Sequence, residues 1–182
     1  MRRVIWLGAT LVLLATTLGV TAWSDFKDLG HQREWDVVAA QAAEAELAGI
    51  RVGVREARAA VVDAKPDRAF LFVRFNLQGS PEAAKSWIDC SASLQGAGGE
   101  TWLPLYDYRI RGAVKILASD GKDNGNCNPG AVSGTGPVTF DQIYRLPTAA
   151  LDNLTLHVSG YGTRPSALAF KLKPTIRTFK SE

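Results

Sequence analysis

The run Ala69-Phe70-Leu71-Phe72-Val73-Arg74-Phe75-Asn76-Leu77 contains the clearest strand pattern in this chain. Side chains alternate between the two faces of an extended strand. One face carries only apolar side chains (Leu71, Val73, Phe75 and Leu77). Arg74 and Asn76 point to the opposite face. This alternation predicts a strand that places one face in a hydrophobic core.

Strand patterns continue on both sides of this run, separated by turns rich in glycine, proline and aspartate. The expected strands cover residues 51–62, 87–94, 101–105, 138–146, 154–159 and 167–172. A change of phase within 51–62 predicts a bulge or bend. Residues 119–130 form a long polar loop, and 106–118 fit either a strand or a short helix. Seven or so strands indicate a mainly β protein built as an antiparallel β-sandwich.

Four segments are expected along the chain. Residues 1–23 form a signal anchor or signal peptide, and residues 50–174 form the β-sandwich. Residues 24–49 are rich in alanine and glutamate, which are good helix formers, so a short juxtamembrane helix is expected there. It would expose Trp35 on a thin apolar stripe. Residues 175–182 are expected to be a C-terminal tail.

The N-terminal segment has two interpretations. Arg2 and Arg3 precede a run without charge that ends before Asp25, about the length a spanning helix needs. We expect residues 4–23 to hold the chain in a bacterial inner membrane, with the domain facing the periplasm or exterior. The alternative is a secreted protein cleaved after Ala22, because Val20-Thr21-Ala22 fits a signal-peptidase site.

Composition indicates one domain with little net charge. The chain has 182 residues and a formal charge of +3, which falls to +1 without Arg2 and Arg3. About 160 residues after the apolar run are enough for one well-formed core. This charge gives no basic footprint for nucleic acid, so no nucleic-acid partner is expected.

Cys90 and Cys127 are the two cysteines of the chain. In an oxidising compartment a lone pair of this kind favours a disulfide. Closing a loop of this length would stabilise the fold by roughly 4 kcal/mol in the chain-entropy account. With His31 and His157 as the other soft donors, the spacing does not match a zinc site.

No catalytic constellation stands out, and no cofactor or metal is expected. Both histidines, His31 and His157, are interpreted as surface residues. The Asp and Asn residues of the 119–130 loop do not follow a calcium-loop spacing. The enzymatic alternative is a hydrolase that uses a pair of carboxylates. Its candidates are Asp89, Asp107 and Asp141.

A group of aromatic and basic residues is the candidate binding site. It comprises Trp102, Tyr106, Tyr108, Arg109 and Arg111, with Lys115 nearby. Aromatic and arginine side chains dominate binding hot spots, and aromatic faces beside polar groups can hold a sugar. The competing interpretation buries Trp102 and Tyr106 in the core.

Three segments resemble a group of small bacterial envelope proteins related to a secreted mycobacterial antigen family. They are Phe70–Phe75, the glycine-rich turn within 94–105 with its Trp-Leu-Pro ending, and Val138–Pro147 before Leu154–Val158. The resemblance covers about residues 50–174 and implies an immunoglobulin-like sandwich. It supplies no catalytic residue, and a Cys90–Cys127 bridge would depart from its pattern. By analogy with immunoglobulin domains, Trp87 would pack in the core beside Cys90.

Together these features predict a non-enzymatic, membrane-anchored envelope domain that binds a protein or a glycan. A structural subunit of an envelope assembly, with the Trp35 helix as its contact, is the alternative. Fold alone does not choose between these functions.

Overall fold

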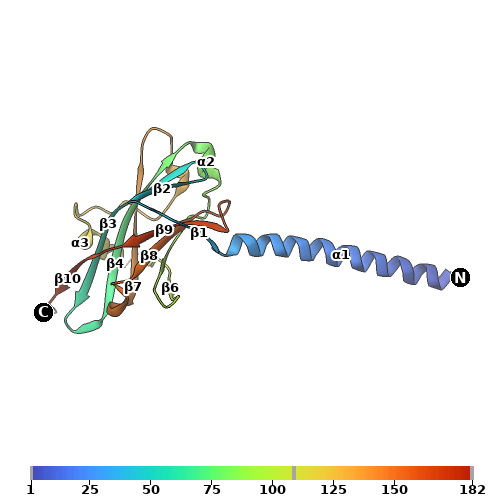
Figure 1. The fold of residues 1–182 in the computed structure, drawn as a ribbon, viewed down its shortest axis with the longest axis horizontal. Helices are drawn as coiled ribbons and strands as arrows, with labels where there is room; N and C mark the ends of the chain where they lie inside the picture. The colour runs from blue at the N-terminus through green and yellow to red at the C-terminus, as the bar shows by residue number, and fades with distance from the viewer. Residues whose placement is uncertain (1, 108–109, 181–182) are drawn as a thin grey trace.

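The computed structural model describes residues 2–107 and 110–180 and shows a long N-terminal helix followed by a two-sheet β-domain (Figure 1). The helices are α1 (Arg2–Gln32), α2 (Pro81–Lys85) and α3 (Arg111–Leu117), with 3-10 turns η1 (Pro129–Ala131) and η2 (Thr148–Ala150). The strands are β1 (Asp36–Ala39), β2 (Glu44–Leu47), β3 (Ile50–Val62), β4 (Lys65–Gly79), β5 (Ser91–Gln95), β6 (Thr101–Trp102), β7 (Val138–Pro147), β8 (Leu154–Ser159), β9 (Ser166–Leu172) and β10 (Thr175–Phe179).

The strands form two sheets. Sheet A has the order β1-β9-β8-β5-β6, and sheet B has the order β10-β3-β4-β7, with β2 also pairing with β3. Most pairs are antiparallel, but β1 runs parallel to β9 and β10 runs parallel to β3. The prediction of a mainly β, two-sheet protein is therefore confirmed, whereas a purely antiparallel arrangement is wrong.

The connectivity of the central strands follows the immunoglobulin order. In that order, strands A, B and E are neighbours in one sheet, C, F and G are neighbours in the other, and the chain crosses over after B. Here β3, β4 and β7 are neighbours in sheet B, β5, β8 and β9 are neighbours in sheet A, and the chain crosses from one sheet to the other between β4 and β5. The strands β1, β2, β6 and β10 extend these two sheets.

The β3–β4 hairpin has the pattern expected from the sequence. The strand β4 includes all of residues 69–77, and the alternate residues from Leu71 to Leu77 are buried in the main core. The phase change in β3 is a register shift between Val54 and Glu56, as the sequence predicts.

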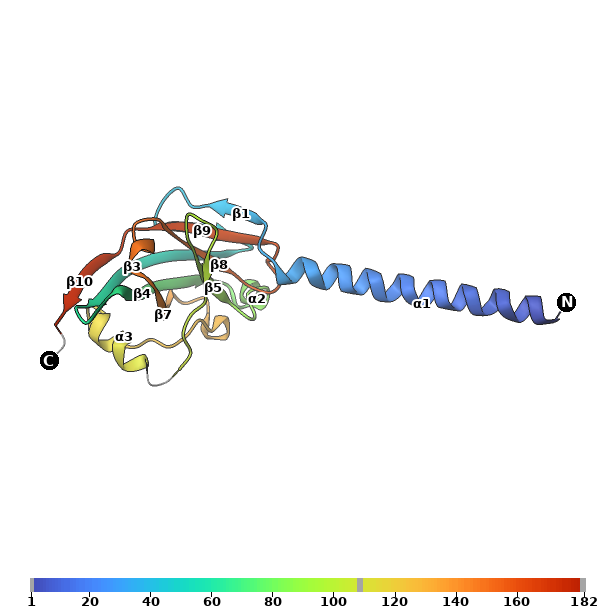
Figure 2. The ribbon, with the colours of Figure 1, turned by 90° about the horizontal axis from the view of Figure 1, so that it is seen from below.

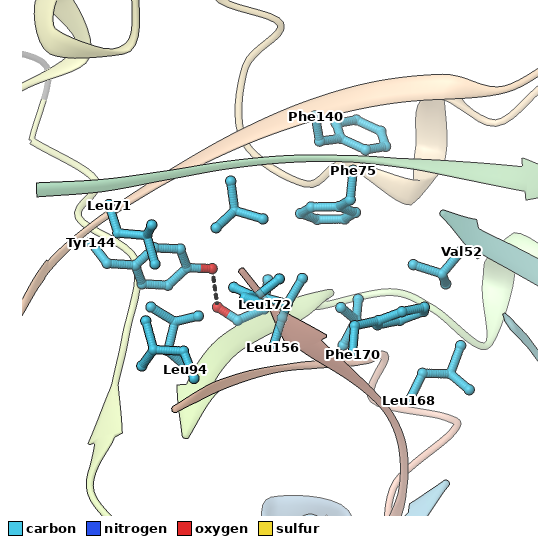
Figure 3. Packing of buried hydrophobic residues seen from close by; sticks show 14 of the residues in the cluster. Val52, Leu71, Phe75, Leu94, Phe140, Tyr144, Leu156, Leu168, Phe170 and Leu172 are labelled. Atoms are coloured by element: carbon cyan, nitrogen blue, oxygen red, sulfur yellow. Dashed lines mark hydrogen bonds between the residues drawn. The ribbon is translucent and has the colours of Figure 1, made fainter. Parts of the chain in front are cut away.

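The main core lies between the two sheets (Figure 3). Sheet B contributes Phe75 and Phe140, whose rings lie 6.1 Å apart, and sheet A contributes Leu156 and Phe170. Tyr144 is fully buried and donates a hydrogen bond from its hydroxyl to the carbonyl of Ala92, 2.9 Å away. Burial raises the pKa of Tyr144 well above its ordinary value, so it remains a neutral donor. Each fully buried large side chain contributes roughly 1.5–3 kcal/mol.

The outer face of sheet B carries a second, smaller core. The helix α3 lies over this face and buries Val114 and Leu117 against Phe72 and Ile143 (Figure 2). Residues 111–117 are therefore a helix, whereas the sequence fits either a strand or a helix there. The strand β4 thus has apolar partners on both faces over part of its length.

A disulfide connects the region after α2 with the long polar loop. Cys90 and Cys127 are bonded, as the sequence predicts, and no free cysteine remains. Trp87 is fully buried in the same core cluster that Cys90 and Cys127 contact. The strand expected over 87–94 begins only at Ser91, because residues 81–85 form α2 and the chain turns before β5.

The N-terminal helix is longer than expected and the following segment is not helical. The helix α1 runs without interruption to Gln32 and extends away from the β-domain, with exposed Trp6, Leu14 and Trp23 (Figures 1 and 2). Within the described part of the chain, no helix combines the length and apolar character of a membrane span.

The predicted helix over 24–49 is wrong beyond Gln32, because β1 and β2 occupy 36–39 and 44–47. Pairing with β9 and β3 supplies these residues with sheet hydrogen bonds, which outweigh the helix propensity of alanine.

The C-terminal tail also belongs to the domain. Residues 175–179 form β10, which continues sheet B beside the second half of β3. The expected boundary at residue 174 is therefore wrong, although Lys180 lies beyond the strand.

Candidate functional site

The predicted aromatic and basic residues do not all lie where the sequence suggests. Trp102 is half-buried and packs against the main core. Tyr106 is 63% exposed, so it does not fill the core. Tyr108 and Arg109 lie outside the described residues, and Arg111 begins α3. Lys115 is exposed on α3. Two neighbours that the sequence did not single out, Leu103 and Ile116, are each 65% exposed.

Trp102 lines a surface pocket of about 290 Å³ at the tip of the β5–β6 hairpin. Its ring lies directly on the backbone of Gly96, because a side chain there would come within 2.9 Å of the ring. Glu100 accepts a hydrogen bond from the amide of Gly98, which holds its carboxylate beside the pocket. Asn153 also lines this pocket. An aromatic ring, a carboxylate and an amide therefore meet at one concave surface.

This pocket is one of four that adjoin along one edge of the sandwich, and we call them together the edge groove. A pocket of about 340 Å³ shares Gly96, Ala97 and Asn153 with the Trp102 pocket. On the other side, Pro147 also lines a pocket of about 470 Å³. That pocket shares Arg68 and Arg145 with a fourth, of about 340 Å³. The residues that line the edge groove include the start of β4, the end of β7 and the β5–β6 hairpin. The ribbon of these segments lies at the lower edge of Figure 1.

Arg74 stands at the centre of a buried polar network on the outer face of sheet B. Its guanidinium donates two hydrogen bonds to Asp141, at 2.7 and 3.0 Å. A third nitrogen lies 2.9 Å from Asp120, and the side chain also donates to the carbonyl of Lys122. The ring of Phe72 lies beneath the guanidinium, 5.4 Å from its carbon. The hydrogen bonds that Arg74 donates to Asp141 raise the pKa of Arg74 despite its burial.

Residues 119–127, which we call the cover loop, close over this network. Asn124 donates two hydrogen bonds to Asp141, from its backbone and its side-chain amide. Ser119 donates two to Glu56 on β3. The backbone amide of Lys122 and the guanidinium of Arg74 lower the pKa of Asp120. The loop oxygens that resemble calcium ligands in the sequence therefore bind protein groups, and the described residues include no cluster of three metal-ligating side chains.

A second polar cluster fastens the end of α1 to sheet A. The carboxylate of Glu34, just after the helix, accepts a hydrogen bond of 2.5 Å from the buried hydroxyl of Ser159. The same carboxylate lies 3.6 Å from the imidazole of His157. Arg164 donates to the same hydroxyl at 3.1 Å. Burial would raise the pKa of Glu34, but hydrogen bonds from His157 and Ser159 outweigh it and lower the pKa. His157 lies on the outer face of β8, as the sequence predicts, but its side chain is only 13% exposed beside Glu34.

Neither cluster has the geometry of a hydrolytic site. The hydroxyl of Ser159 donates to Glu34, and the imidazole of His157 lies 3.6 Å from the same carboxylate, whereas activation of a nucleophile needs the base beside the hydroxyl. Asp141 is fully buried in its pair with Arg74 rather than facing a groove. Both clusters connect segments distant in the sequence, which explains why spacing did not reveal them.

Comparisons with known proteins add little. No family model matches the chain, and no curated protein does. Among solved structures it is similar to a "putative lipoprotein" of Staphylococcus aureus subsp. aureus NCTC 8325, with 10% identity, TM-score 0.43 and coverage of 78% of this chain and 96% of that one.

A second similar structure is a "putative lipoprotein" of Bacillus subtilis subsp. subtilis strain 168. Its identity is 12% and its TM-score 0.43, with coverage of 73% of this chain but only 39% of that one. Likenesses at this level carry no argument about function.

Proposed function

We propose that this protein is a non-enzymatic domain of the bacterial cell envelope that binds a glycan through the edge groove. The observation that carries the proposal is the half-buried ring of Trp102, which lines a pocket with Glu100 and Asn153. A sugar ring has an apolar C–H face that can stack on an indole, and hydroxyls that a carboxylate and an amide can bind. We also propose that the β-domain is related to the secreted mycobacterial antigen family that its sequence resembles.

The envelope location is supported by three features. Arg2 and Arg3 precede a stretch without charge up to Asp25, the described apolar side chains of α1 are exposed, and Cys90 and Cys127 form a disulfide. Disulfides persist in compartments outside the cytosol. We propose that residues 4–23 hold the chain in the inner membrane with the β-domain outside, and that cleavage after Ala22 is the alternative.

Reading the N-terminus of the protein purified from its host tests this location. Mass spectrometry of the membrane fraction is expected to find an intact N-terminal segment. A chain that begins at Trp23 and lies in the soluble fraction would replace the anchor with a secreted domain.

Calorimetric titration of the full chain in detergent with a panel of oligosaccharides tests glycan binding. We expect Trp102→Ala to weaken binding at least about tenfold, because truncating an aromatic anchor is costly. Asn153→Ala, at an exposed position, checks the same pocket without altering the core. Tyr106→Ala is the matched control, since Tyr106 is exposed but does not line the pocket. Binding that survives both pocket substitutions would contradict the proposal.

A protein partner is the second candidate, favoured by the exposure of Leu103, Tyr106 and Ile116. A partner crosslinked in cells should be lost when Tyr106 and Ile116 are both replaced by serine, and retained in Trp102→Ala. The reverse result would assign the partner to the edge groove. A structural subunit is a further alternative, but its expected contact helix at Trp35 is absent: Trp35 lies just before β1 and is 61% exposed.

A further inference from the structure

Three cationic side chains surround the end of the edge groove formed by the β3–β4 hairpin and β7. Lys65, Arg68 and Arg145 line this pocket together with the apolar Val62, Ala69 and Phe70. Phe70 on β4 lies directly opposite Arg145 on β7, and Arg68 lies two residues before Phe70 on the same face. The strand pairing therefore places two guanidinium groups beside one aromatic ring, on the outer face of sheet B.

Arg68 forms an exposed ion pair with Asp67. Asp67 approaches Arg68 at 3.5 Å, and the two side chains are 72% and 61% exposed. Exposed ion pairs of this kind are weak, because water screens both charges. Arg68 can therefore exchange Asp67 for an anion of a ligand at little cost.

Cations also stand at the opposite end of the groove. Lys171 and Lys173 line the pocket beyond Trp102 and Asn153. The lining of the edge groove thus has five basic side chains and three acidic ones. The basic side chains are Lys65, Arg68, Arg145, Lys171 and Lys173. The acidic side chains are Asp67, Glu100 and Asp152. Positive charge is concentrated at the two ends, on either side of the pocket of Trp102.

We propose that the ligand of the edge groove is an acidic polysaccharide whose carboxylates bind Arg68 and Arg145. This inference rests on the proposed glycan function and specifies its substrate class. A guanidinium presents a planar pair of donors that matches a carboxylate, and Lys65 adds a third charge. The ring of Trp102 holds a sugar further along the same chain, because the four pockets share lining residues in series and so suit an extended ligand better than a single monosaccharide.

Titration of the full chain in detergent with oligogalacturonate and its methyl ester tests the proposal. The ester keeps the sugar rings but removes their charge. We expect oligogalacturonate to bind at least about tenfold more tightly at low salt, with a difference that shrinks as salt shortens the screening length. Arg68→Gln and Arg145→Gln should each weaken binding about fivefold, a usual effect of losing one exposed charge pair. Lys85→Gln is the control, since Lys85 lies on α2 outside the groove.

Each outcome separates this inference from the proposed function. Equal affinity for both oligosaccharides, lost in Trp102→Ala, would overturn the acidic substrate and leave the glycan function standing. Failure of both to bind would overturn both. Inorganic phosphate serves as a third probe: if it displaces oligogalacturonate at equal molar concentration, the pocket is a small-anion site and the polysaccharide proposal is wrong.

Discussion

Arg74 and Arg145 lie on the outer face of neighbouring strands of one sheet, yet their surroundings are opposite. Arg74 faces Asp141 directly across the β4–β7 pair and is buried beneath the cover loop. Arg145 faces Phe70 in the same pair and is exposed in a pocket. The residue opposite and the loop above decide the role of each arginine: one stabilises the fold, and the other remains accessible to a ligand.

Removing the carboxylate opposite Arg74 is expected to have the largest effect. Asp141→Asn leaves a buried guanidinium without its bidentate partner, which costs about 3–5 kcal/mol. Urea unfolding of the full chain measures the change in the free energy of unfolding. A loss under about 1 kcal/mol would mean that Asp120 and Glu56, which lie 2.9 and 3.8 Å from the guanidinium, neutralise Arg74 without Asp141.

A matched double variant sharpens the same test. Replacing Arg74 with methionine and Asp141 with leucine removes both charges, so no buried ion is left unpaired. Its free energy of unfolding should recover a large part of the loss.

Opening the disulfide should have the next largest effect, because Cys127 ends the cover loop. The double substitution Cys90→Ser, Cys127→Ser is expected to cost about 2–4 kcal/mol. Hydrogen exchange at the amide of Asn124, which donates to Asp141, should accelerate more than exchange in β8. Unchanged protection of this amide would show that the polar network alone keeps Arg74 covered.

The Glu34 cluster provides an intermediate case. Glu34 lies between α1 and β1, and its carboxylate is 15% exposed beside His157 and Ser159 of sheet A. Its lowered pKa means that its contribution to stability is fully present above the pKa of the unfolded chain, about 4.3, and is lost as pH falls through the folded-state value. Glu34→Gln should therefore cost about 1 kcal/mol near pH 7 and nothing at low pH. Thermal unfolding from pH 3 to 7 measures this, and a parallel offset at every pH contradicts it.

Arg145→Gln should change stability least, by under about 0.5 kcal/mol, since substitutions of exposed residues away from special contacts usually do. The same urea measurement applies. A loss above about 1 kcal/mol would mean that Arg145 stabilises the fold as Arg74 does, and the two arginines would no longer differ in role.

The sequence predicted the sheets better than the surroundings of their polar residues. Alternation along 69–77 fixed both the strand and the face of Arg74, because apolar periodicity is a local property. The burial of Arg74 was not predictable, since it depends on Asp141 and on a loop that arrives from elsewhere in the chain.

The same distinction between local and distant contacts explains which residues of the candidate site were predicted from the sequence and which were not. Trp102 was identified because a short segment rich in aromatic and basic residues is visible locally. Arg68 and Arg145 were missed because only the β4–β7 register brings them together. Residues 36–47 were misassigned because their alanines favour helix, while the pairing that holds them as strands lies with distant partners.

The parallel pairing of the first and last strands has a mechanical consequence. Backbone hydrogen bonds run across a sheet, so tension along β1 or β10 must slide each strand past β9 or β3 and load its bonds together. The two termini lie at opposite ends of the molecule (Figures 1 and 2). A chain held at its N-terminus and pulled at its C-terminus would resist the force in shear rather than unzip, first at β1 and β10.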